Sequence, residues 1–362
     1  MSRSLLTTRL CRTLGIRHPI VLAGMAGGAT TPELVAAVSR AGGLGTFGLT
    51  GMSVEAVRLA VSRACALTSA PIAINVLVAP PTPADPAGPD PRTVLAPFRV
   101  ELGLSAQTPA ATVPATPHAL IEAGLQSGAR VVSVGLGDPG VVRDLARAAG
   151  APLLAMASSV DDAVRAVDAG ADVIVAQGAE AGGHRSTFDV PADGVVPLIG
   201  TFALVPQVVA AVDVPVIAAG AVMNGRGLAA ALALGADGAQ MGTRFLVAAE
   251  SGAPESYRRR VSAARDTDTV ITRAISGRPA RGIRNRLITT LEAAGPPALG
   301  YPRQAGASAE LRAAAAAADD PEMIALWAGQ AAGLSGSGQS AQEIVDEIIA
   351  EAVAVIKGLA ER

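Results

Sequence analysis

The sequence predicts a (β/α)8 barrel followed by a C-terminal helical subdomain, and three observations lead to this prediction. Eight short apolar segments alternate with helical segments before residue 254. Glycines precede several of the predicted strands, at Gly150, Gly170 and Gly235, where they can end the preceding helix. The sixth apolar segment ends in glycines and a histidine, and barrel enzymes build their sites at such strand ends. Strands at this spacing favour a barrel over an open doubly wound sheet.

The predicted organisation has three parts. The barrel spans residues 1–253, a helical subdomain spans 254–339, and a C-terminal helix over 340–362 packs on the barrel. This last helix begins at a capping box, Ser340–Glu343, and presents one apolar face. The predicted strands lie at Pro19–Met25, Leu44–Gly48, Pro71–Val78, Val131–Val134, Pro152–Ala157, Asp172–Ala176, Pro215–Ala219 and Gly238–Gly242.

Composition excludes several classes of function. The formal net charge is −2 and aromatic residues make up 2% of the chain, which argues against a nucleic-acid partner. Lys357 is the only lysine, so Schiff-base chemistry lacks its nucleophile. Cys11 and Cys65 lack metal-ligand spacing, so no metal site is predicted. The chain shows no secretory leader and no apolar run of about 18 residues, which predicts a cytoplasmic protein without a membrane span.

The loop after the sixth strand is the first candidate for chemistry. It contains Gln177, Glu180, Gly182 and His184, and His184 is one of only three histidines in the chain. A histidine at a strand end can transfer protons near neutral pH, although it can also serve only as scaffold for the loop. His18 is a poorer candidate because it precedes the first strand, at the opposite end of the barrel.

The loops after the seventh and eighth strands are the second candidate. Both are glycine-rich, over Gly220–Gly227 and Gly242–Phe245. Loops at these two places in a barrel often bind phosphate through backbone N–H groups, although the glycines here can also serve only tight turns. Flavin mononucleotide (FMN) fits such a site, with Asn75 and Gln177 as amides that can reach the ring edge or be satisfied inside the barrel.

Two further segments require interpretation. Gly135–Gly140 matches the G-x-G-x-x-G pattern of dinucleotide-binding loops, but Pro139 lacks a backbone donor and the match lies among barrel units. We interpret it as an ordinary loop in which Asp138 caps the next helix. The proline-dense segment 80–91 is either a lid over the site or a disordered excursion.

Several motifs lie in order along most of the chain, at Ala41–Thr46, Gln177–His184, Pro215–Gly220, Ala231–Gly238, Gln240–Phe245 and Gly277–Arg281 with Asn285. Together they resemble the nitronate monooxygenase family, formerly called 2-nitropropane dioxygenases. The resemblance implies a barrel that holds FMN without a covalent bond, with His184 as the catalytic base.

The resemblance also implies which residues contact the flavin. One departure is visible, because the family often has a second glycine after Gly220 and this chain has Ala221. If that backbone needs positive φ or a very close approach of the phosphate, the methyl group weakens the site. The implied contacts are Ala23, Gly24, Met25, Asn75, Gln177, Gly182, Gly220, Gln240, Met241, Gly242 and Thr243.

The implied reaction is oxidative denitrification of an alkyl nitronate or nitroalkane, with O2, to a carbonyl compound and nitrite. The main alternative is an FMN-dependent NAD(P)H reductase, similar either to quinone reductases or to the flavin-containing enoyl-acyl-carrier-protein reductases. The latter resemble the chain in Glu180–His184 and Arg265–Asp268. A barrel that binds a phosphorylated ligand without redox chemistry is a third possibility. The helices after residue 254 could form a homodimer contact.

Overall fold

Eight parallel strands form a closed barrel in the computed structural model, which describes residues 6–82, 88–106, 114–191, 193–336 and 338–361. The strand order is β1-β9-β8-β6-β5-β4-β3-β2. The two ends of this sheet meet through Leu44, directly before β2. The N–H of Leu22 donates to the carbonyl of Leu44, and the N–H of Leu44 donates to the carbonyl of Ile20, both at 2.9 Å. The predicted barrel and its eight strands are therefore confirmed.

The barrel strands are short, and β7 is an addition outside the barrel. β7 covers Gly183–His184 only, so the seventh and eighth predicted strands are β8 and β9. The barrel strands are β1 (Ile20–Leu22), β2 (Gly45–Gly48), β3 (Ile72–Leu77), β4 (Val131–Gly135), β5 (Leu153–Ala157), β6 (Val173–Gln177), β8 (Val216–Ala219) and β9 (Gly238–Met241).

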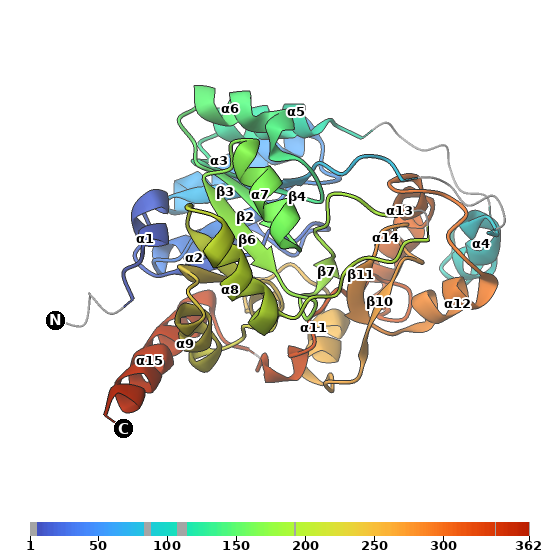
Figure 1. Cartoon of the computed structure of the whole chain (residues 1–362). Helices are drawn as coiled ribbons and strands as arrows, with labels where there is room; N and C mark the ends of the chain where they lie inside the picture. The colour runs from blue at the N-terminus through green and yellow to red at the C-terminus, as the bar shows by residue number, and fades with distance from the viewer. Residues whose placement is uncertain (1–5, 83–87, 107–113, 192, 337, 362) are drawn as a thin grey trace.

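Helices surround the barrel on the outside (Figure 1). Side-chain caps define where several begin: Thr31, Ser53, Ser159 and Asn224 each accept a hydrogen bond from a backbone N–H of the first turn. The helical elements of the barrel are α1 (Arg9–Leu14), α2 (Pro32–Arg40), α3 (Val54–Leu67), α5 (Pro117–Gln126), the 3-10 turn η1 (Pro139–Val142), α6 (Arg143–Ala148), α7 (Val160–Asp168), α8 (Thr201–Ala211), α9 (Gly225–Ala233) and α10 (Thr243–Leu246).

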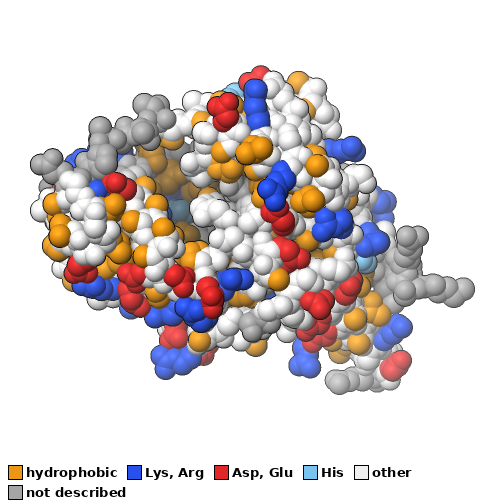
Figure 2. Space-filling model, turned by 180° about the vertical axis from the view of Figure 1, so that it is seen from behind, with side chains coloured by type: hydrophobic (Ala, Val, Ile, Leu, Met, Phe, Trp, Pro, Cys, Tyr) orange, Lys and Arg blue, Asp and Glu red, His pale blue; other side chains and the backbone are white. Residues whose placement is uncertain are grey.

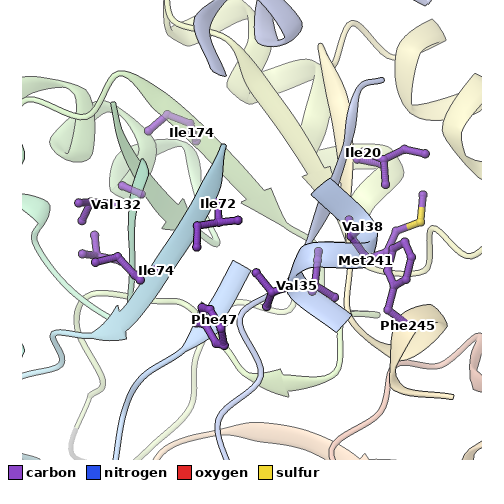
Figure 3. Close-up of a cluster of buried hydrophobic side chains, with 14 of the residues drawn as sticks. Ile20, Val35, Val38, Phe47, Ile72, Ile74, Val132, Ile174, Met241 and Phe245 are labelled. Carbon is purple, nitrogen blue, oxygen red and sulfur yellow. The ribbon is translucent and has the colours of Figure 1, made fainter. Parts of the chain in front are cut away.

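Alternation along the strands divides the barrel core into two layers. Ile20, Ile72, Ile174 and Met241 belong to the outer layer between strands and helices, and Figure 3 shows Met241 beside Val38 of α2. The inner layer fills the barrel itself and is closed at the amino ends of the strands by α1. Its strand residues include Val21, Ala73, Val131, Val173, Val175, Ile217 and Ala219.

The segment 254–339 contains helices, as expected, but also a β-hairpin that the helical expectation did not include. β10 (Thr269–Thr272) pairs antiparallel with β11 (Ala280–Ile283), and β11 pairs with β7 from the loop after β6. The helical elements are α11 (Glu255–Ser262), α12 (Arg286–Ala294), α13 (Arg303–Ala307), α14 (Ala309–Ala317) and the 3-10 turn η2 (Ala332–Leu334). A three-stranded sheet therefore joins this segment to the barrel.

The segment around α4 (Pro91–Glu101) lies with the C-terminal elements although it follows β3 in the chain (Figure 1). It packs against α12 and α13, and Leu95 belongs to a hydrophobic cluster formed mostly by residues after 246. Residues 83–87 of the proline-dense segment lie outside the described residues. At its end, Asp90 caps α4, which begins at Pro91.

The C-terminal helix α15 (Ala341–Ala360) packs against α9 and α2. Its capping box is present: the Ser340 hydroxyl accepts from the N–H of Glu343, whose carboxylate accepts from the N–H of Ser340. At Gly135–Gly140, Asp138 caps η1 by accepting from the N–H of Gly140 at 2.7 Å, as expected for an ordinary loop. Among the helices in the described ranges, none is long and apolar enough to cross a membrane.

Candidate active site

Four polar side chains form the last interior layer at the carboxyl ends of the strands. Asn75 and Ser133 continue the inward-facing positions Ala73 and Val131, and Gln177 continues Val173 and Val175. Ala219 is paired with both Gln177 and Gln240, which places these three residues in one row across β6, β8 and β9. The predicted amides Asn75, Gln177 and Gln240 are thus brought together at one end of the barrel.

Met241 lies differently from its neighbour Gln240. Its side chain is 1% exposed and belongs to the outer layer with Val38 and Phe245 (Figure 3). Only its backbone can therefore contribute to a ligand site at the barrel mouth, and its carbonyl already accepts a hydrogen bond from the N–H of Ala23 at 2.9 Å. Strand alternation explains the difference, because successive side chains point to opposite faces.

The loop after β6 is held by the side chain of Gln177. Its Nε2 donates to the carbonyl of His184 at 2.9 Å, and its Oε1 accepts from the N–H of Ser186 at 2.8 Å. Asn75 is used in a similar way, since its Nδ2 donates to Ser133 Oγ at 2.9 Å. Both amides therefore have structural partners, and each keeps part of its hydrogen-bonding capacity for a ligand.

His184 is fixed by contacts that come from the C-terminal elements. Its backbone pairs with Ala280 of β11. Its Nε2 lies 2.9 Å from Ser276 Oγ. The rings of Trp327 and Tyr301 lie 5.7 Å and 6.1 Å from the imidazole, centroid to centroid. Trp327 is the only tryptophan in the chain, so rare aromatic side chains gather on the predicted base.

The surroundings of His184 are positively charged. Burial, followed by the nearby guanidinium groups of Arg278 and Arg312, lowers the pKa of His184 to about 4. Arg278 is fully buried and donates to the carbonyls of Thr187 and Phe188, and neither arginine forms an ion pair within the described ranges. His184 is consequently neutral at physiological pH in a site that favours anions.

Arg185 and Glu180 complete the framework of this loop. Arg185 is 2% exposed and donates to the carbonyls of Gln177, Ser158 and Pro197. Burial lowers its pKa to about 10, which leaves it charged. Glu180, to which the sequence assigns no role, accepts from the N–H of Thr201 at 2.9 Å and so caps α8.

The loops after β8 and β9 differ from the loop after β6, because several of their backbone N–H groups have no acceptor among the described residues. The backbone N–H groups of 221–223 and of 242–244 donate to no acceptor in the described part of the protein. β8 and β9 are adjacent, so these free donors lie on neighbouring loops. Gly220 has φ of +105°. This arrangement of unpaired N–H groups suits an anionic group such as a phosphate.

Ala221 occupies left-handed backbone, with φ of +47°. A non-glycine residue there costs on the order of 1–2 kcal/mol, because its Cβ approaches the following carbonyl. The condition under which Ala221 weakens the loop is therefore met in this chain. Arg244, on the neighbouring loop, is occupied by Ser335, Gln339 and Glu347, and so anchors the C-terminal segment.

The remaining predicted contacts lie around the same mouth. A Cβ on Gly24 would lie 2.6 Å from Cβ of Asn75, and one on Gly182 would lie 2.6 Å from the carbonyl carbon of Ala328. Thr243 Oγ1 accepts from the N–H of Gly329 at 3.0 Å. Ala23, Gly24 and Met25 are the three residues after β1. The space-filling view shows a hollow between the barrel and the C-terminal elements (Figure 2).

The sequence did not single out Ser276, Arg278, Tyr301, Arg312 or Trp327. Arg278 lies inside the Gly277–Arg281 motif and Ser276 directly precedes it, so the motif marks this turn without assigning it a role. The others reach His184 from segments more than 100 residues further along the chain.

Comparisons with known proteins agree with this geometry. The family model described as nitronate monooxygenase matches residues 7–351. The chain belongs to the nitronate monooxygenase family. It is 38% identical over 349 residues to a probable nitronate monooxygenase of Staphylococcus saprophyticus, covering 96% of this chain and 98% of that protein. Membership of this family makes the chain an oxidoreductase that acts on a small-molecule substrate.

Two solved structures show the same fold over nearly the whole length of this family member. Nitroalkane oxidase from Streptomyces ansochromogenes has a TM-score of 0.84 and 34% sequence identity, with 97% of this chain and 99% of that chain covered. FabK from Thermotoga maritima has a TM-score of 0.77 and 30% identity, with 98% of each chain covered. The family and fold expected from the sequence motifs are thus confirmed.

Proposed function

We propose that this protein uses FMN and O2 to denitrify alkyl nitronates or nitroalkanes oxidatively, giving a carbonyl compound and nitrite. The observation that supports it most is His184, a neutral imidazole near the guanidinium groups of Arg278 and Arg312, neither of which forms an ion pair within the described residues. A nitronate is an anion, and a nitroalkane becomes one when it loses its α-proton. Both therefore suit a positively charged site with a proton acceptor in it.

The residues at the barrel mouth fit FMN. The unpaired N–H groups of 221–223 and 242–244 would hold its phosphate. The amides of Asn75 and Gln240 face the barrel interior, where they would contact the ring. Gly24 lies so close to Asn75 that a Cβ would be 2.6 Å from the Asn75 Cβ, so a side chain at position 24 would displace this amide. When bound, FMN supplies an electron acceptor that O2 can regenerate.

The side chains of this chain would perform the remaining work. His184 accepts the α-proton of a neutral nitroalkane or orients a nitronate that is already ionised. Arg278 and Arg312 stabilise the negative charge of the nitronate. Trp327 and Tyr301 border the imidazole and limit the access of water. Gln177 and Arg185 keep the loop in position.

A spectroscopic titration tests the proposal. The purified protein should show the visible absorption of an oxidised flavin. Under anaerobic conditions, propionate 3-nitronate or a nitroalkane should change that spectrum without NADPH. Aerobic turnover should consume O2 and release nitrite. A colourless protein that cannot be loaded with FMN would instead favour a barrel that binds a phosphorylated ligand without redox chemistry.

The second candidate is an FMN-dependent NAD(P)H reductase. The 30% identity to FabK from Thermotoga maritima, over 98% of both chains, favours it. Rapid anaerobic bleaching by NADPH, with no spectral change on addition of nitronate, would support this reaction and contradict the first. The same sample can therefore decide between the two.

A further inference from the structure

Ser276 is the only described side chain that makes a hydrogen bond to the imidazole of His184. Its Oγ lies 2.9 Å from His184 Nε2. The same hydroxyl donates to the carbonyl of Arg278 at 3.1 Å and accepts from the N–H of Arg278 at 3.3 Å. Nδ1 of His184 has no hydrogen-bond partner among the residues the structure describes.

The three contacts of this hydroxyl determine where the imidazole proton lies. A hydroxyl has one proton to donate and two lone pairs that accept. If its proton goes to the Arg278 carbonyl, its lone pairs can accept from the Arg278 N–H and from an N–H on His184 Nε2. All three contacts are then satisfied. If the proton instead goes to His184, the buried carbonyl of Arg278 loses this donor.

The turn that carries Ser276 is held firmly. Ser276 is 2% exposed. Gly277 lies so close to the 299–301 segment that a Cβ would be 2.9 Å from the N–H nitrogen of Tyr301. Gln304 donates to the carbonyl of Ala274 at 2.8 Å. The pairing of His184 with Ala280 fixes the other partner. The hydroxyl cannot easily move away from the imidazole.

We propose that Ser276 is a positioning residue that holds His184 in the Nε2-protonated tautomer and leaves the lone pair on Nδ1. The catalytic consequence, that Nδ1 is the atom that acts as base, rests on the proposed function. The α C–H bond of a neutral nitroalkane breaks, its proton forms a bond to Nδ1, and the electron pair moves into the nitro group to give the nitronate.

The proposal separates the two forms of substrate. Deprotonation of a nitroalkane needs the lone pair on Nδ1, whereas a preformed nitronate needs no proton removed. Ser276→Ala should therefore lower kcat/KM for a neutral nitroalkane by about tenfold or more, within the range expected for acid–base catalysis, and lower it much less for the corresponding nitronate. Ser276→Thr, which keeps the hydroxyl, should recover most of the loss.

Nitrogen-15 NMR of histidine-labelled protein tests the tautomer directly. The chain has three histidines, so the imidazole signals are few, and His184→Asn identifies those of His184. We expect Nε2 of His184 to carry the proton in the wild-type protein. We expect Ser276→Ala to give a mixture of tautomers or the reverse one. Ser39→Ala is the matched control, because Ser39 is a buried serine that also donates to one carbonyl and accepts from one N–H.

Two results would overturn the assignment. The positioning role fails if wild-type His184 carries its proton on Nδ1, or if Ser276→Ala leaves the tautomer as it was. The consequence for catalysis fails if Ser276→Ala reduces turnover of nitroalkane and nitronate by the same factor. The NMR result does not require turnover, so failure of the proposed reaction is distinguishable from failure of the positioning role.

Discussion

The two sides of the barrel mouth differ in how much of their hydrogen bonding the protein itself completes. On the β6 side, Gln177, Glu180, Arg185 and His184 all have protein partners. On the β8–β9 side, six consecutive or neighbouring N–H groups at 221–223 and 242–244 donate to no described protein acceptor. Under the proposed function, the β6 side is preorganised for proton transfer, whereas a bound ligand would complete the β8–β9 side.

The largest expected effect comes from removing the base itself. His184→Asn should lower kcat/KM for a neutral nitroalkane by about 10²–10⁴-fold, the range for loss of a general base. Flavin content should stay unchanged, because the phosphate loops are untouched. Steady-state kinetics with the absorption spectrum as control checks this prediction. A yellow variant that denitrifies the nitroalkane at the parent rate would remove His184 from the mechanism.

Arg185→Met should show how strongly the β6 side is held. The substitution leaves two buried carbonyls and one partly buried carbonyl without their donor and should lower the free energy of unfolding by about 3 kcal/mol. Arg259→Met is the matched control, since Arg259 forms exposed ion pairs and should cost less than about 1 kcal/mol. Equal losses for the two variants in urea unfolding would contradict the framework role of Arg185.

The pH dependence of stability should report the burial of His184. Its pKa is lowered to about 4 in the folded protein, from 6.5. As the pH falls from 6.5 toward 4, the unfolded chain takes up a proton that the folded protein does not, so stability is lost in that window. The contribution is at most about 1.4 kcal/mol per pH unit. His184→Asn should flatten this part of the curve, and parallel curves for both proteins would be inconsistent with the shift.

Ala221→Gly, on the β8–β9 side, should have the smallest effect of these substitutions. Glycine removes the strain of left-handed backbone at φ +47° and should stabilise the loop by about 1 kcal/mol. If the strain is relieved only with ligand bound, FMN should bind about fivefold more tightly, as the same energy implies. Titration of apoprotein with FMN measures this, and unchanged or weaker binding would show that Ala221 carries no penalty for FMN binding.

Much of the barrel was predictable because its signals are local. Apolar strands with glycines before them identify each unit, and a histidine at the end of β6 stands out in a chain with three. Gln240 and Met241 were predicted together from one motif, yet alternation sends only Gln240 inward. Counting from Ala239, which lies in the outer layer, would have separated them.

The partners of His184 were not predictable from local pattern. Ser276 is 92 residues away in the chain and meets it only because β7 pairs with β11. The β10 run Thr269–Thr272 is β-branched and does carry a strand signal, but it follows an Arg-rich helical segment. Contacts of this kind depend on tertiary pairing, which no short window of sequence specifies.

Under the proposed function, the N–H groups after β8 and β9 that donate to no described protein acceptor would hold the phosphate of the flavin. Riboflavin has the same ring as FMN and lacks the phosphate, so the two ligands isolate this contact. The affinity of the apoprotein for each ligand can be measured by flavin fluorescence. FMN should bind at least about 100-fold more tightly than riboflavin, because its phosphate accepts two or more charge-assisted hydrogen bonds. Equal affinities for FMN and riboflavin would contradict the account.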